Sequence, residues 1–174
     1  MKGLGVARLG VCILATAVGV STNVYGQSAT VTFYSHAKVF SGFPVEKRGV
    51  FYGSVYDGNQ PLVDFDAGFF PKDNRFATFS LPPGPHVFSA TYDAHPSKKH
   101  PYPLTLEAGK QYFLRVRSQG TQLIVLTLID GRMDEVPCEM AHLETEKAKP
   151  LPSKNASSTM AASMVPVTSI PSCP

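Results

Sequence analysis

The stretch "SLPPGPHVFSATY", residues 80–92, joins two short alternating runs through three prolines and a glycine. Pro82 and Pro83 fix φ and donate no hydrogen bond, so the strand before them must end there. Gly84 adopts backbone conformations that residues with a Cβ resist, and Pro85 restarts the chain in an extended conformation. The stretch therefore predicts a rigid corner that fixes the register of the next strand and prevents slippage and strand addition.

Short alternating runs rich in Val, Phe, Tyr, Thr and Leu lie on both sides of this corner. In 29–34 the apolar side chains fall on one face, which is typical of a strand with one face in a core. Gly58, in a polar turn between 50–56 and 62–65, indicates a hairpin. The pattern predicts an all-β fold, an antiparallel immunoglobulin-like or prealbumin-like β-sandwich of about seven or eight strands. The predicted strands cover 29–34, 50–56, 62–65, 75–81, 87–92, 104–106, 111–118 and 121–129.

From residue 111 onward the sequence departs from a simple alternation of apolar and polar residues. In 111–118, Arg115 and Arg117 share one face, which we expect to be solvated. Residues 121–129 are apolar on both faces, which predicts a central strand covered from both sides. Residues 137–147 predict a short helix that could form part of this cover.

Both ends of the chain predict segments outside the sandwich. Residues 1–26 have Lys2 and Arg8 ahead of an apolar run too short to span a bilayer, which predicts a signal peptide cleaved after Gly26. The expected product is soluble and periplasmic or extracellular, with no stable membrane span. Its sandwich domain should cover 27–145, and 146–174, which is rich in Pro, Ser, Ala and Thr and lacks aromatic residues, predicts a disordered tail.

Charge bears on the kind of partner, and cysteine content bears on a possible cross-link. Removal of Lys2 and Arg8 lowers the 16 basic residues to 14, against 13 acidic ones, so nucleic-acid binding is not expected. Cys138 and Cys173 either form a disulfide that closes a loop of about 35 residues or remain separate thiols. The triplet at 155–157 matches a glycosylation sequon.

The sequence contains none of the strong catalytic motifs, and we expect no catalytic residue, bound metal or cofactor. Asp93, His95 and His100 could ligate a metal, but the lysines and prolines between them favour an exposed loop. His36 and His86 are more typical of structural histidines at the rim of a sandwich. The candidates for binding are therefore aromatic residues and histidines of presumed loops. They are Phe40, Phe43, Phe69, Phe70, His95 and His100.

Four segments together resemble the bacterial domain of unknown function family 2846: TVTFYSHAKVFSG at 30–42, VYDGN at 55–59, LPPGPHVFSATY at 81–92 and LTLEAGKQYFLRV at 104–116. The resemblance covers about residues 29–145. It implies a small exported all-β sandwich, and it carries over no catalytic residue because the family has no established activity. Many members are lipid-anchored, whereas this chain lacks an acylation cysteine after its apolar run.

These observations predict an exported, non-enzymatic binding or scaffolding module that contacts an unknown component of the bacterial cell envelope. One alternative is a hydrolase or metal-dependent enzyme whose residues converge from separate loops, with His36, His86, His95 and His100 among them. The other is a self-associating structural protein. The sequence leaves the oligomeric state open.

Overall fold

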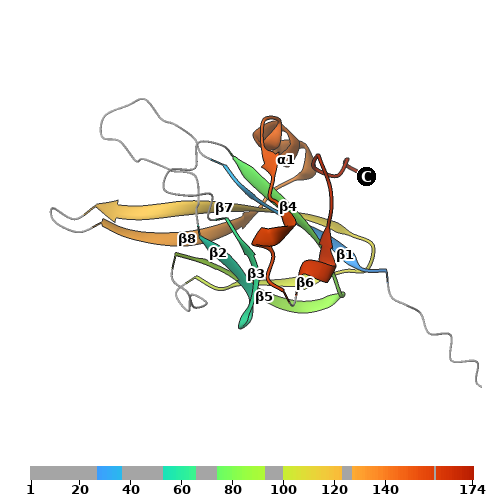
Figure 1. Cartoon of the computed structure of the whole chain (residues 1–174), viewed down its shortest axis with the longest axis horizontal. Helices are drawn as coiled ribbons and strands as arrows, with labels where there is room; N and C mark the ends of the chain where they lie inside the picture. The colour runs from blue at the N-terminus through green and yellow to red at the C-terminus, as the bar shows by residue number, and fades with distance from the viewer. Residues whose placement is uncertain (1–26, 37–52, 66–73, 93–99, 123–126, 159) are drawn as a thin grey trace, which may run out of the picture.

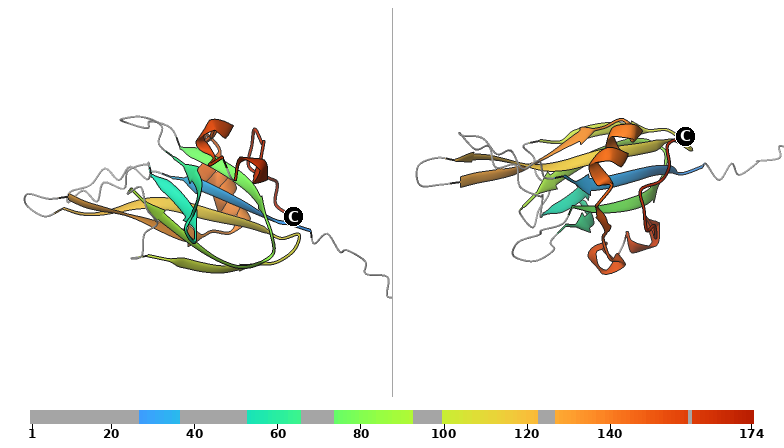
Figure 2. Two further views of the ribbon diagram at one scale, coloured as in Figure 1. Left: turned by 60° about the horizontal axis from the view of Figure 1, so that its bottom comes forward. Right: turned by 90° about the horizontal axis from the view of Figure 1, so that it is seen from above.

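The computed structural model describes residues 27–36, 53–65, 74–92, 100–122, 127–158 and 160–174, which form two facing β-sheets and one helix (Figures 1 and 2). The first sheet has the strand order β10-β4-β1-β7-β8, with β9 also paired to β4, and the second has the order β3-β2-β5-β6. The predicted all-β sandwich is confirmed. The strands are β1 (Ala29–Ser35), β2 (Ser54–Asp57), β3 (Gln60–Asp64), β4 (Arg75–Leu81), β5 (Gly84–Thr91), β6 (Tyr102–Leu106), β7 (Gln111–Gln122), β8 (Thr127–Glu135), β9 (Lys149–Pro150) and β10 (Met164–Val165).

The proline-rich corner carries the chain from one sheet to the other. β4 ends at Leu81 in the first sheet, and β5 begins at Gly84 in the second, where the glycine has a φ of 134°. His86 holds this corner, because its Nδ1 lies 2.6 Å from Asp57 Oδ2 and its Nε2 lies 3.0 Å from the carbonyl oxygen of Pro82. The corner therefore sets both the register of β5 and the crossing between the sheets.

Aromatic side chains from both sheets meet in the core between them. The ring of Phe33 in β1 packs edge-on against Phe88 of β5 at 5.3 Å and against Phe79 of β4 at 6.0 Å. All three side chains are fully buried. Edge-on packing of this kind adds to the hydrophobic gain from burial, so these rings fix how the sheets face each other.

Strand pairing departs from the prediction in two places. β1 pairs antiparallel with β4 but parallel with β7, so the first sheet is mixed rather than purely antiparallel. The segment 121–129, predicted as one central strand, instead contributes to two strands, because β7 ends at Gln122 and β8 begins at Thr127. These strands form an antiparallel pair, and β8 is the last strand on its side of the sheet order.

Helix α1 (Cys138–Thr145) confirms the predicted short helix and covers the outer face of the first sheet. Its buried residues include Ala141 and Glu144, whereas Met140 and Leu143 are 45% and 74% exposed. The helix thus packs through a small apolar residue and a carboxylate, because the sheet beneath it presents polar groups that need a partner. Arg115 belongs to that face and is half-buried rather than fully solvated.

The C-terminal segment 146–174, which we call the strap, is not the disordered tail that its composition predicted. Apart from residue 159, the structure describes all of it, and it lies along the side of the sandwich beside β3 and β4 (Figure 1). β9 pairs parallel with the start of β4, and β10 pairs antiparallel with its middle. Between them the amide of Ser157 donates to the carbonyl of Leu62 in β3.

The strap is ordered because it satisfies strand edges that would otherwise be unpaired. Lys149 N donates to Asn74 O and Leu151 N donates to Phe76 O, at 2.9 and 2.8 Å. Leu151 and Ile170 are 5% and 8% exposed, so the strap also contributes apolar side chains to the two cores. Edge strands commonly acquire such a cover, since an open edge invites pairing with another chain.

Candidate functional site

A concave surface runs between β4 and the strap. This strap groove has a volume of about 760 Å³. Its floor includes Phe76, Ala77 and Thr78 of β4, all buried, and its walls come from the strap. The lining residues on the strap are Pro150, Leu151, Pro152, Ser153, Ala161, Met164, Val165, Pro166, Val167 and Thr168.

The chemistry of the strap groove is mostly apolar with a polar margin. Pro150, Pro152 and Pro166 offer rigid apolar rings and no backbone donors, and Met164 adds a flexible, polarisable side chain. Arg75 at the start of β4 supplies a positive charge. An apolar cleft with few polar groups is typical of a site that binds a ligand by burial.

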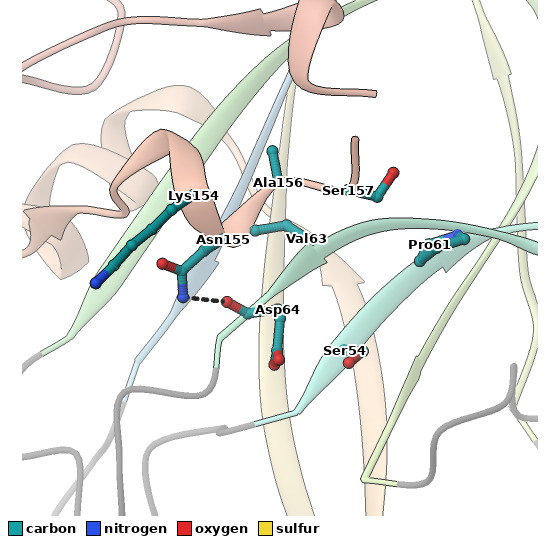
Figure 3. A pocket seen from close by; sticks show the side chains of 8 residues that line it. All are labelled: Ser54, Pro61, Val63, Asp64, Lys154, Asn155, Ala156 and Ser157. Atoms are coloured by element: carbon teal, nitrogen blue, oxygen red, sulfur yellow. Dashed lines mark hydrogen bonds between the residues drawn. The ribbon is translucent and has the colours of Figure 1, made fainter. Parts of the chain in front are cut away.

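A second, smaller pocket of about 390 Å³ lies between the β2–β3 hairpin and the strap (Figure 3). Its polar side chains include Ser54, Asp64, Lys154 and Asn155. The Asn155 amide donates to the backbone oxygen of Asp64 at 3.0 Å, the contact drawn in Figure 3. The sequon asparagine therefore uses its side-chain nitrogen to fasten the strap to β3.

Beneath helix α1 a set of charged and polar groups connects the helix to the first sheet. Tyr34 Oη donates to Glu144 Oε2 at 2.8 Å, and Arg115 Nη1 donates to Glu144 Oε1 at 2.7 Å. Asp134 accepts from Arg117 Nη2 at 3.0 Å and lies 3.4 Å from Arg115 Nη2. Glu144 and Asp134 both pair with arginines of β7, which favours a structural role for this network.

The network shifts the titration of two of its members. Burial, followed by the hydrogen bond to Glu144, raises the pKa of Tyr34 far above its ordinary value. Burial, the largest single effect, lowers the pKa of Arg115, but the charge and hydrogen bond of Glu144 together with Tyr34 and Asp134 outweigh it, and the pKa is raised. Tyr34 therefore remains a hydrogen-bond donor throughout the neutral and mildly alkaline range.

Cys138 and Cys173 form a disulfide, which decides between the two alternatives that the sequence left open. The bond joins the first residue of α1 to the end of the strap, and it closes a separation of 35 residues. His142 lies one helical turn after Cys138, and its Nε2 lies 2.8 Å from the carbonyl oxygen of Pro171. The ligand atoms of Cys138, His142 and Cys173 all lie within 4.8 Å of one another.

The strap groove does not test most of the residues named from the sequence as binding candidates. Phe40, Phe43, Phe69, Phe70 and His95 lie outside the described residues. His100 is half-buried just before β6, on a different part of the chain from the strap groove. The proposed metal set of Asp93, His95 and His100 stays a prediction for the same reason.

Two other histidines have structural partners, as their positions suggested. His86 pairs with Asp57 at the corner, and the amide of Val87 donates to the second oxygen of the same carboxylate at 3.3 Å. His36 Nδ1 lies 3.1 Å from the carbonyl oxygen of Glu144 near the end of α1. These contacts give both histidines structural partners.

Few features of the sequence predict the strap groove. Its signals were Leu151 and Ile170, isolated apolar residues in a polar segment, and Cys173 near the end of the chain. Neither local composition nor periodicity indicates that such residues pack on strands more than 70 positions earlier. Within the described residues, no helix is long and apolar enough to cross a membrane.

Comparisons of this chain with protein-family models, with curated proteins and with solved structures gave no match. The resemblance to family 2846 stays a prediction.

Proposed function

We propose that the chain is an exported, non-enzymatic binding module of the bacterial cell envelope, and that the strap groove is its binding surface. The observation that carries this proposal is the groove itself, a cleft of about 760 Å³ with an apolar floor on β4 and proline-rich walls. Such a surface gains free energy mainly by burying apolar area of a ligand. Its lining includes hydroxyl groups such as Ser153 and Thr168 but no histidine or carboxylate that could act as a general base beside them.

Two further features support the proposal. The Cys138–Cys173 disulfide fits the oxidising compartment expected for an exported protein. Several charged groups of the described chain have structural partners, as in Tyr34–Glu144–Arg115 beneath α1 and His86–Asp57 at the corner. These polar contacts stabilise the fold, and none of them lies in the strap groove.

The test expresses the full chain in a bacterium, recovers the protein from the exported fraction, and measures its co-sedimentation with isolated membranes and with cell-wall sacculi. Ala161 is exposed and lines the groove, so Ala161→Glu places a charge on the proposed surface without removing a core side chain. Val87→Glu is the matched control, because Val87 is 47% exposed on β5 of the other sheet.

We expect saturable binding of the parent chain and of Val87→Glu to one of the two fractions. Ala161→Glu should bind at least about tenfold more weakly, since an unpaired charge on an apolar contact costs more than about 1.4 kcal/mol. The proposal fails if neither fraction retains the parent chain, or if Ala161→Glu binds as well as the control. Recovery of the protein only from the cytoplasm would overturn its assignment to the envelope.

A further inference from the structure

Cys138, His142 and Cys173 form a cluster of potential metal ligands where α1 meets the end of the strap. Cys138 and His142 are one turn apart on α1, a spacing that places both side chains on one face of a helix. Cys173 comes from the strap, and the three ligand atoms lie within 4.8 Å of one another. All three residues are half-buried, so solvent can reach the cluster.

The orientation of His142 is set by the strap. Its Nε2 lies 2.8 Å from the carbonyl oxygen of Pro171, and a carbonyl can only accept, so the nitrogen carries the proton. The lone pair of the neutral ring is then on Nδ1. Histidines that bind metals usually donate their other ring N–H to a carbonyl or carboxylate in this way, which fixes the tautomer and the ring plane.

The geometry points to a second state of the cluster: we propose that, once the disulfide is reduced, Cys138, His142 and Cys173 bind a zinc ion and leave the fourth coordination position to water. Two thiolates and an imidazole are ligands that zinc prefers. Ligand atoms around a tetrahedral zinc are about 3.3 to 3.8 Å apart. The two sulfur atoms, bonded at 2.02 Å in the disulfide, therefore separate by less than about 2 Å.

Reduction of the disulfide precedes zinc binding. A dithiol reductant transfers two electrons and two protons to the Cys138–Cys173 bond, which breaks to give two thiols, while the dithiol becomes its own disulfide. Zinc then displaces the two thiol protons and forms two zinc–sulfur bonds, with no further change in oxidation state. Either state joins α1 to the end of the strap, so the ion replaces the disulfide as the cross-link.

The test uses the full chain with Cys12→Ser, in which Cys138 and Cys173 are the only thiols. The protein is reduced with a phosphine without oxygen, because dithiols themselves bind zinc, and is titrated with Co²⁺ and then Zn²⁺. We expect one Co²⁺ per chain with a thiolate-to-cobalt absorption band, displacement of the cobalt by zinc, and protection of both thiols from alkylation by zinc.

His142→Ala should weaken Co²⁺ binding by at least about tenfold. Even residues that only hydrogen-bond to a metal ligand contribute about 10- to 100-fold to metal affinity. It should still form the disulfide in air, which shows that the strap docks normally. His142→Gln provides a second variant that retains more of the packing, and His100→Ala is the matched control outside the cluster. Absence of the thiolate band in the parent chain, or undiminished binding in both His142 variants, would overturn the proposal. This outcome does not depend on whether the strap groove binds an envelope component.

Discussion

The hydroxyl of Tyr34 donates to the carboxylate of Glu144 at 2.8 Å, across 110 positions of the chain. Tyr34 lies in β1 with no exposed surface, and Glu144 lies near the end of α1 with 8% of its surface exposed. Arg115 of β7 donates to the other oxygen of the same carboxylate. One buried acid thereby connects the helix to two neighbouring strands, which explains why α1 turns Leu143 rather than Glu144 to solvent.

Tyr34→Phe should destabilise the protein, because it leaves one oxygen of a buried carboxylate without its donor. We expect the free energy of unfolding to fall by about 1 to 3 kcal/mol in urea titrations. The matched control is Tyr56→Phe, a buried tyrosine whose hydroxyl has no hydrogen bond within the described residues, and it should change stability by less than about 0.5 kcal/mol. Equal effects of the two substitutions would contradict the role of the Tyr34–Glu144 bond.

The same contact predicts a loss of stability in alkali. Burial and the Glu144 hydrogen bond raise the pKa of Tyr34 above that of an unfolded tyrosine, so the folded state holds this proton more tightly. The stabilisation is complete below about pH 10 and declines as the pH rises toward the folded-state pKa. Urea midpoints at about pH 8 and about pH 11 should differ more for the parent chain than for Tyr34→Phe. An identical decline in both would show that other groups are responsible.

Local signals in the sequence predicted the parts of the fold that depend on local conformation. Such signals act on the backbone locally, whatever surrounds them: they are the prolines at 82 and 83, the turn at Gly58 and the alternating runs. The corner, the hairpin and most of the strands agree with them. The parallel pairing of β1 with β7 could not be predicted in this way, because a pairing between distant strands leaves no local pattern. At α1 the larger apolar side chains, Met140 and Leu143, are exposed, so the helix does not pack through them.

The candidate site was missed for a related reason. Composition measures how much apolar surface a segment can bury by itself, and the strap has little. Its order depends instead on edge strands that offer unpaired backbone groups and on a covalent link to α1. The pairing of Cys138 with Cys173 remained undecided because spacing along the chain does not determine distance in space.

Loss of the disulfide should loosen the strap before it unfolds the sandwich. Cys173→Ser removes a cross-link that spans 35 residues, for which loop-closure entropy predicts a loss of about 3 to 4 kcal/mol. Trypsin should then cleave after Lys154 faster than in the parent chain, since its segment would leave β3 more often. Cys12→Ser, which retains the disulfide, is the control. Unchanged cleavage and stability in Cys173→Ser would show that backbone pairing alone holds the strap.

Gly131 marks a place where the two sheets approach too closely for a side chain. A Cβ at this position of β8 would clash with the carbonyl oxygen of Ala90 in β5. Gly131→Ala should therefore cost about 1 to 3 kcal/mol through displacement of backbone. Gly58→Ala is a useful comparison, because that site has open space and is strained only by its φ of 55°. Faster hydrogen exchange in β5 should accompany Gly131→Ala alone, and its absence would argue against this close contact.

The corner depends on His86 as well as on its prolines. The ring bridges the Asp57 carboxylate and the Pro82 carbonyl, so it joins the β2–β3 hairpin to the point where the chain changes sheets. His86→Ala removes both contacts and should lower the free energy of unfolding by about 1 to 3 kcal/mol. Val87→Ala, at the neighbouring exposed position, should have little effect. If both variants unfold at the parent's urea midpoint, the prolines and Gly84 suffice to define the corner, and the histidine bridge contributes nothing to it.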